Sequence, residues 1–392
     1  MKLRREVRGG LAGLLAICLA SSPSHALVTL NDSHDHIRVN GSFSVSRDSN
    51  IFASADNAGD FVYSTGLSAS YQRRAGWIGV NASVSMGASR FGTHTTENFS
   101  NPSYSLELTK QSGRTTGSFT LSAARESRAD AAVNFRTDSW NYNAGLNFKY
   151  PIKNRSTLTG GLSYSGRFYA DSISLSNLAT YSSNLDFIYM LPRERDLVAG
   201  YRYRYSATSR DSAYTDHSLT AGINGKLIFG LNGGIRAGVQ SRIPQGSAAN
   251  QGTFSSWSGS GSIAYPINRK LSLGATVAKD FSTTATDSSV DSLTASLDAK
   301  YAYSRKWSLS ANAGWGDSYF LGEKGRVILA VNPLQLGPNR HEQFVNWGAN
   351  LGYARSEHFT LSLSYSWFQN WSTTSFSDFI RTTWSLSLSS GW

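Results

Sequence analysis

The stretch that decides the fold is Tyr150-Pro-Ile-Lys-Asn-Arg-Ser-Thr-Leu-Thr-Gly-Gly-Leu162, an aromatic residue, a tight polar turn and a strand alternating polar with apolar residues. Variants of this phrase begin at Tyr265, Tyr303 and Tyr353. An alternation with a period of two places apolar side chains on one face of a strand and polar ones on the other. The repeated phrase therefore predicts a chain of antiparallel β-hairpins.

The first 26 residues have the features of a cleaved secretory signal peptide. Four Lys or Arg residues among the first eight precede an apolar run from Leu11 to Ala20, and Ser22-Pro-Ser-His-Ala26 ends on small residues. The run is too short for a membrane-spanning helix, which needs about twenty apolar residues. We expect residues 1–26 to be removed on export. Cys18 is the one cysteine of the chain, so the mature protein has no disulfide or thiolate metal site.

Residues 27–392 have a uniform composition, which predicts a single all-β domain. Short turns are expected near residues 72–76, 110–113, 151–154, 192–195, 226–230, 266–269, 304–306 and 355–357. Longer polar loops are expected at 49–59, 92–102, 206–215 and 316–342. Short turns at one end and long loops at the other are typical of a transmembrane antiparallel β-barrel with periplasmic turns and extracellular loops. Eight turns imply about eighteen strands, with sixteen as the alternative.

The strand Tyr201-Arg-Tyr-Arg-Tyr205 shows the choice between a barrel and a soluble sandwich. In a sandwich the tyrosines would pack inside and the arginines would face water. In a barrel the tyrosines would meet lipid, while Arg202 and Arg204 would point into a wet lumen. The strand alone fits both. The signal peptide, the uniform composition and the number of hairpins favour the barrel.

The last strand places Trp384, Leu386, Leu388 and Trp392 at intervals of two or four residues. This pattern resembles the C-terminal signal of Gram-negative outer-membrane proteins that the barrel-assembly machinery recognises, although Ser390 departs from it. Residues 27–392 as a whole resemble outer-membrane β-barrels. The aromatic-Pro-Ile-Asn/Lys hairpins and the expected size also resemble the porins encoded beside bacterial exopolysaccharide genes, without a diagnostic motif. These resemblances imply an outer-membrane location and leave the oligomeric state open.

The lumen of so wide a barrel is either an aqueous channel or plugged. About ten residues separate the leader from the first strand expected at Ile37, too few for a plug domain. The chain carries a net charge of +11, of which residues 1–26 hold +3, which leaves +8 for the mature protein. By strand parity, the basic residues expected to face the lumen are Arg38, Lys149, Arg167, Arg202, Arg204, Arg236, Arg242 and Lys300, and the acidic ones are Glu107, Asp186, Asp280 and Asp298.

Two interpretations of these lumenal charges stay open. They could create a positive potential that favours anionic solutes or an acidic polysaccharide, or they could pair across strands and only hydrate the wall. The loop 316–342 is a candidate constriction because it is long and apolar in its middle, with Phe320, Arg326 and Arg340 as candidate residues. A hairpin extending the wall is the alternative for this loop.

The sequence contains no Gly-x-Ser-x-Gly, His-Glu-x-x-His or phosphate-loop motif, so we expect no enzyme activity, no metal and no cofactor. The dispersed basic residues argue against nucleic acid. Export of an exopolysaccharide, with a periplasmic export complex as partner, is the leading hypothesis for function. A general diffusion porin for small hydrophilic or anionic solutes, and an adhesin or structural barrel whose loops bind partners, are the alternatives.

Overall fold

The structure is a computed structural model that describes residues 28–30, 35–74, 76–130, 135–170, 175–227, 231–321, 328–329, 332–333, 340–374 and 377–392. The signal peptide expected at residues 1–26 lies outside these ranges. In the described part of the chain, no helix is long and apolar enough to cross a membrane.

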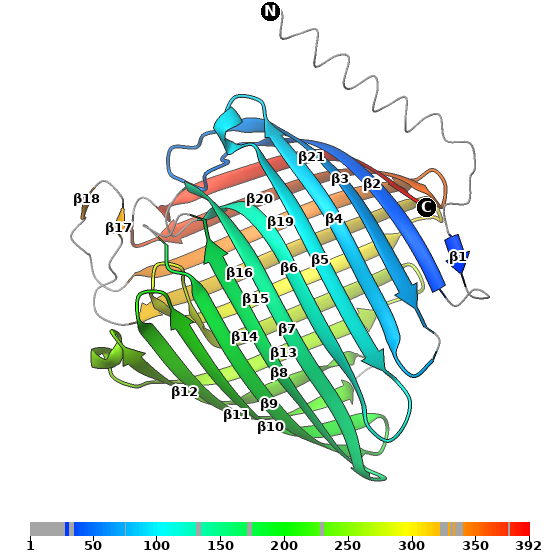
Figure 1. The fold of residues 1–392 in the computed structure, drawn as a ribbon, viewed down its shortest axis with the longest axis vertical. Coiled ribbons are helices and arrows are strands. Elements are labelled where there is room, and N and C mark those ends of the chain that lie inside the picture. The colour runs from blue at the N-terminus through cyan, green and yellow to red at the C-terminus, as the bar shows by residue number, and fades with distance from the viewer. Residues whose placement is uncertain are drawn as a thin grey trace, which may run out of the picture.

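Eighteen long antiparallel strands form one closed sheet, which confirms the larger of the two predicted strand numbers (Figure 1). Each strand pairs with its neighbours in the chain, and pairing of Asn40–Asp48 with Thr383–Gly391 closes the ring. A short strand, β1 (Val28–Leu30), adds to the start of β2. The strands are β2 (Asp35–Asp48), β3 (Asp60–Arg73), β4 (Gly79–Phe91), β5 (Phe99–Lys110), β6 (Thr116–Asp130), β7 (Phe135–Lys153), β8 (Ser156–Tyr169), β9 (Leu178–Leu191), β10 (Arg195–Thr208), β11 (Ser212–Lys226), β12 (Asn232–Gly246), β13 (Phe254–Pro266), β14 (Leu271–Thr283), β15 (Ser289–Ala302), β16 (Trp307–Leu321), β19 (His341–Ala354), β20 (Phe359–Ser372) and β21 (Phe379–Gly391).

The two ends of the barrel differ as the sequence predicts. All eight short turns lie between the expected strand pairs and gather at one end, the short-turn end, where the C-terminus also lies (Figure 1). The opposite end, the long-loop end, carries the 3-10 turns η1 (Thr95–Glu97) and η2 (Ala249–Gln251) and the small β17 (Ile328–Leu329) and β18 (Asn332–Pro333) pair.

Three of the four predicted long loops are shorter than expected. The loop predicted at 206–215 is wrong, because β10 and β11 continue to Thr208 and from Ser212 and leave a turn of three residues. The segment 92–102 gives its last four residues to β5, and the segment 316–342 gives its ends to β16 and β19. In each case the strand ends carry polar residues, because one face of each strand meets a wet lumen. The sequence of such a strand end therefore resembles that of a loop.

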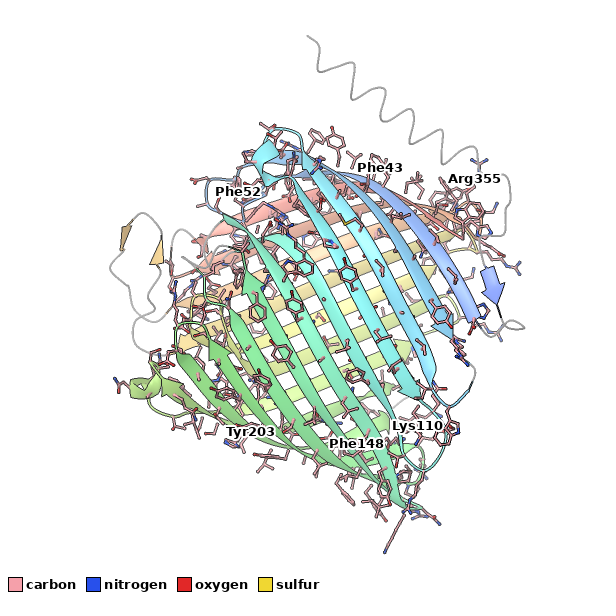
Figure 2. All side chains as sticks on the ribbon, in the orientation of Figure 1. Phe43, Phe52, Lys110, Phe148, Tyr203 and Arg355 are labelled. Carbon is pink, nitrogen blue, oxygen red and sulfur yellow. The ribbon has the colours of Figure 1, made fainter. Side chains whose placement is uncertain are left out.

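The outer face of the wall is apolar. On β10, Leu197, Tyr201 and Tyr203 are exposed on one face, while Arg202 and Arg204 occupy the other. The same alternation exposes Leu67, Leu219, Val239 and Leu297 on other strands, and Figure 2 shows Tyr203 and Phe148 directed away from the barrel. A continuous exposed apolar face of this size is stable against lipid and not against water. The opposite face of each strand therefore lines the lumen.

The last residue of the chain extends the β2–β21 seam that closes the ring. Trp392 exchanges two backbone hydrogen bonds of 2.9 Å with Val39, and its ring stacks on His358 with centroids 4.7 Å apart. The other members of the terminal pattern, Trp384, Leu386 and Leu388, lie on β21 opposite β20 and β2.

Removing Trp392 is expected to lower the yield of closed barrel sharply, because the β2–β21 seam loses its terminal pair of hydrogen bonds and a stacked aromatic contact. The yield is measured by the heat-dependent gel shift of protein refolded into vesicles. Trp392→Ala keeps the backbone bonds and should fold better than the truncated chain. An equal loss in both variants would show that the side chain alone matters.

Candidate functional site: a charged cluster at the long-loop end

Five charged side chains meet on the lumenal side near the long-loop end, and we call them the mouth cluster: Arg202, Arg204, Asp216, Arg242 and Asp280. They come from β10, β11, β12 and β14. Asp216 accepts hydrogen bonds from Nε of Arg204 at 2.7 Å and from Nε and Nη2 of Arg242 at 2.6 and 2.8 Å. Asp280 accepts from Arg202 at 2.7 Å and from Arg204 at 3.0 Å. The arginines are thus bridged by two carboxylates.

Arg242 is fully buried, which is unusual for an arginine. Its guanidinium lies 5.1 Å from the ring centroids of both Tyr214 and Phe281. Besides Asp216, it donates to the carbonyl of Ser282 at 2.7 Å and to the hydroxyl of Ser289 at 2.6 Å. A buried charge with so many partners holds several strands in one arrangement.

The contacts of the mouth cluster show that the tip of the β14–β15 hairpin bends into the lumen. β14 pairs with β13 only as far as Lys279, opposite Gly259. Beyond that point Arg204 donates to the carbonyl of Phe281 at 2.6 Å, although three strands separate β10 from β14 in the wall. A side chain on the lumenal face of β10 can reach the Phe281 carbonyl only if the end of β14 leaves the wall and turns inward. We call residues 280–291 the infolded tip.

The turn of the infolded tip is fixed by hydrogen bonds to the β8–β9 and β10–β11 connections. The carboxylate of Asp287 accepts from the hydroxyls of Thr208 and Ser212 at 2.6 and 2.7 Å. The carbonyl of Ala285 accepts from the amide of Ser176 at 2.8 Å, and Ala285 packs with Tyr169 and Leu175 in a small apolar core. The tip therefore spans part of the lumen and narrows it.

The β6–β7 hairpin leaves the wall in the same way. β6 pairs with β5 only as far as Ala124, opposite Ser103, because Pro102 has no amide hydrogen to extend the ladder. Arg136 on β7 then donates to the carbonyls of Ser127 at 2.7 Å and of Ile51 at 3.3 Å. Its guanidinium also lies over the rings of Phe91 and Phe99. A cavity of about 290 Å³ lies between this hairpin and Leu175, which packs against Ala285 of the infolded tip.

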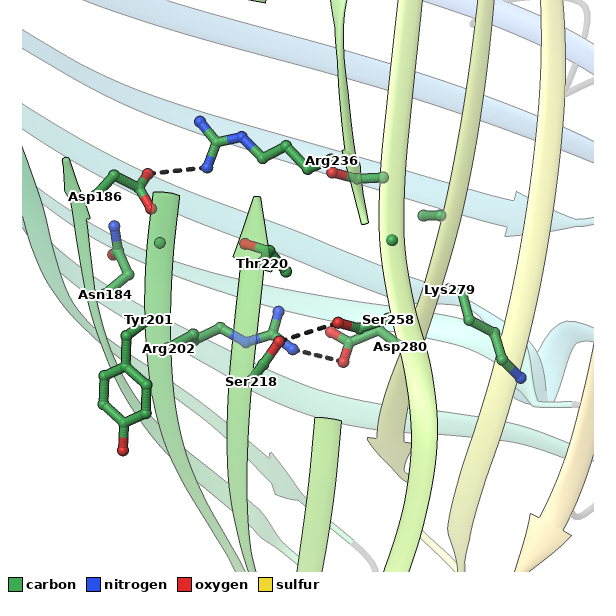
Figure 3. A pocket seen from close by; sticks show the side chains of 14 residues that line it. Asn184, Asp186, Tyr201, Arg202, Ser218, Thr220, Arg236, Ser258, Lys279 and Asp280 are labelled. Atoms are coloured by element: carbon green, nitrogen blue, oxygen red, sulfur yellow. Dashed lines mark hydrogen bonds and ion pairs between the residues drawn. The ribbon is translucent and has the colours of Figure 1, made fainter. Parts of the chain in front are cut away.

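A second cavity of about 380 Å³ lies below the mouth cluster on the lumenal wall (Figure 3). Arg236 and Asp186 form an ion pair of 2.9 Å at one side of it, and Arg202 and Asp280 form the other side. The hydroxyls of Ser218 and Ser258, 3.1 Å apart, lie between the two ion pairs. The lining offers both signs of charge and several hydroxyl groups, which suits a small hydrophilic solute.

The structure brings together six of the twelve charged residues that strand parity placed in the lumen. Arg202, Arg204 and Arg242 belong to the mouth cluster with Asp280, and Arg236 pairs with Asp186. Arg167 lies apart from them, with Nε 3.1 Å from the hydroxyl of Ser139 and its guanidinium over Tyr169.

The other five candidates occupy strand positions whose parity faces the lumen. They lie toward the short-turn end and do not join a cluster. They are Arg38 on β2, Glu107 on β5, Lys149 on β7, and Asp298 and Lys300 on β15. Among the described residues, none of the five has an ion pair within 4.0 Å. Cross-strand pairing, the second interpretation of the lumenal charges, thus applies near the long loops and not near the short turns.

The candidate constriction in the loop 316–342 falls largely outside the described residues, and it stays a prediction. Arg326 lies in that part. Phe320 lies on β16, and the guanidinium of Arg340 sits 4.5 Å from its ring centroid. Arg340 also donates to Glu342 and to the hydroxyl of Ser377.

Parity reasoning missed the residues that organise the mouth cluster. Sequence parity does not identify Asp216, because the loop predicted at 206–215 ends next to it and conceals the start of β11. It does not identify Asp287 either, which lies in the turn between β14 and β15. The alternation of Tyr214, Asp216 and Ser218 with Thr215, His217 and Leu219 is the signal that could have extended the strand. Arg136 and Asp138 on β7 also lie outside the predicted set of charged residues. Among the residues that the structure describes, no three His, Cys, Asp or Glu side chains are grouped to hold a metal ion.

No protein-family model and no curated protein sequence matches the chain. Solved structures with a similar fold include OpdK of Pseudomonas aeruginosa, determined with vanillate, at 13% identity and a TM-score of 0.49, covering 91% of this chain and 99% of that one. OccAB3 of Acinetobacter baumannii gives 11% identity and a TM-score of 0.47, covering 91% and 99%. The FrpB iron transporter of Neisseria meningitidis gives 11% and 0.49, covering 87% and 62%. The likeness at these identities concerns the fold.

Proposed function

We propose that this chain is an outer-membrane channel through which small hydrophilic solutes diffuse past a charged constriction at the long-loop end. The observation that supports the proposal most directly is the infolded tip, held on the lumenal side of β10 to β12 by Arg204 and Arg242. An apolar outer face, a polar lumen and a narrowed mouth are the parts that a selective pore needs.

Export of an exopolysaccharide remains a prediction that no contact in the structure favours. A polymer in transit needs a continuous open path, and the hydrogen bonds from Thr208 and Ser212 to Asp287 cross the path near the long loops. Solute diffusion is the better supported of the two functions, because a small molecule needs a narrower opening than a polymer and a narrowed mouth is compatible with its passage. An adhesin role depends on the long loops and likewise stays a hypothesis.

Reconstitution tests the channel. Protein refolded into planar bilayers is expected to give discrete conductance steps, and proteoliposomes are expected to swell in small sugars but not in oligosaccharides. Boiled protein and lipid alone are the controls. Absence of both conductance and swelling in correctly folded protein would exclude a diffusion channel. Swelling that continues with long oligosaccharides would favour polymer export.

A further inference from the structure

The two ends of the barrel carry opposite charge. Taking each connection with one strand residue on either side, the eight short turns hold fourteen Lys or Arg and two Glu, whereas the nine connections at the long-loop end hold four basic and ten acidic residues. The net positive charge of the protein is thus concentrated at the short-turn end. We call these fourteen residues the basic collar: Arg73, Arg74, Lys110, Arg114, Lys153, Arg155, Arg193, Arg195, Lys226, Arg269, Lys270, Arg305, Lys306 and Arg355.

Most of the basic collar has no counter-charge within the protein. Among the described residues, only Lys226 has a close carboxylate partner, Glu194 at 2.5 Å, while Arg73 lies 3.9 Å from Asp35. Thirteen of the fourteen side chains are exposed, with Arg195 half-buried. A ring of uncompensated like charges repels itself, so an anionic partner at this end would lower the free energy of the folded protein.

The basic collar lies beside aromatic side chains on the outer face. The guanidinium of Arg114 sits 4.6 Å from the ring centroid of Tyr150, and Nζ of Lys110 lies 6.0 Å from the ring of Trp77. Trp77 is 82% exposed and Tyr303 is 64% exposed. Tyrosine and tryptophan at strand ends mark the polar boundary of a bilayer. Figure 2 shows Lys110 and Arg355 at this end and Phe52 at the other.

Basic side chains at that boundary are within reach of lipid phosphates. A cavity of about 430 Å³ opens between the β3–β4 and β5–β6 turns, lined by Arg73, Arg74 and Trp77 and also by the lumenal Glu107. Lys and Arg side chains close to an anionic lipid surface are attracted to it. We propose that the basic collar binds the headgroups of anionic phospholipids in the adjacent leaflet and thereby seats the short-turn end in the membrane.

Quenching of tryptophan fluorescence by brominated lipids tests whether the basic collar binds anionic headgroups. Folded protein in vesicles that contain brominated phosphatidylglycerol or brominated phosphatidylcholine is expected to show a several-fold preference for phosphatidylglycerol, weakened by high salt. The variant Arg155→Gln/Arg269→Gln/Arg305→Gln removes three collar charges that make no hydrogen bond or ion pair among the described residues, and it is expected to lose much of the preference. The matched control Arg47→Gln/Arg90→Gln/Arg128→Gln removes three exposed charges toward the long-loop end and should keep it.

Two results would overturn the proposal. Equal quenching by the two lipids in the wild type would show that the collar does not select anionic headgroups. A collar variant that keeps its lipid preference but changes the ratio of anion to cation permeability would assign the charge to solute entry instead. The first result does not depend on whether the channel conducts in the wild type, because lipid preference is measured on folded protein without ion flow.

Discussion

Replacing Asp216 with alanine is expected to lower the free energy of unfolding by about 3–5 kcal/mol, because it leaves a buried guanidinium without its counter-charge. Asp216 is 1% exposed, and it is the carboxylate that bridges Arg204 and the fully buried Arg242. Arg204 keeps Asp280 as a partner, whereas Arg242 keeps only a carbonyl and a hydroxyl. The measurement is urea unfolding of vesicle-embedded protein, followed by tryptophan fluorescence.

Two further variants separate the buried charge from a general effect of substitution. Asp298→Ala removes a lumenal carboxylate that is exposed and forms no ion pair, so its effect should stay within about 0.5 kcal/mol. Asp216→Leu combined with Arg242→Met removes both charges of the pair and should recover most of the loss, since uncompensated charge is the main cost. A double variant no more stable than Asp216→Ala would show that hydrogen-bond geometry, and not charge, dominates.

Replacing residues 284–288 with Asn-Gly is expected to raise single-channel conductance several-fold, because it removes the turn that holds the infolded tip across the lumen. Thr283 and Ser289 are already paired, so a two-residue turn can close the shortened hairpin. The replacement removes Asp287, and with it the contacts to Thr208 and Ser212. Conductance is measured in planar bilayers at fixed salt.

Deleting residues 322–337 is the matched control for this prediction, because it shortens the other candidate constriction. If the infolded tip limits the current, only the 284–288 replacement should change conductance. If the deletion of 322–337 raises conductance and the replacement does not, the constriction lies in that loop, as its apolar sequence predicts. Both variants need the same heat-dependent gel shift as the wild type before their currents are compared.

The sequence by itself determined the β-barrel and the position of every short turn, and it left eighteen and sixteen strands as alternatives. Turn residues such as Pro151 and Pro266 and the alternation around Tyr201 to Tyr205 act through neighbours in the chain, so they can be read without knowing the fold. Strand parity also identified Arg202, Arg204, Arg242 and Asp280 individually, because a period of two assigns each residue to one face.

The tertiary structure alone decided which of these residues meet. Asp280 reaches Arg202 and Arg204 only because the end of β14 separates from β13 and crosses the lumen, and no local pattern encodes a contact between residues 76 and 78 positions apart. The same holds for Asp287 with Thr208. Lumenal strand ends are polar on the inner face and resemble loops, so the limits of β10 and β11 depended on pairing with each other and with β9 and β12. The constriction is therefore a property of the closed barrel and not of any one segment.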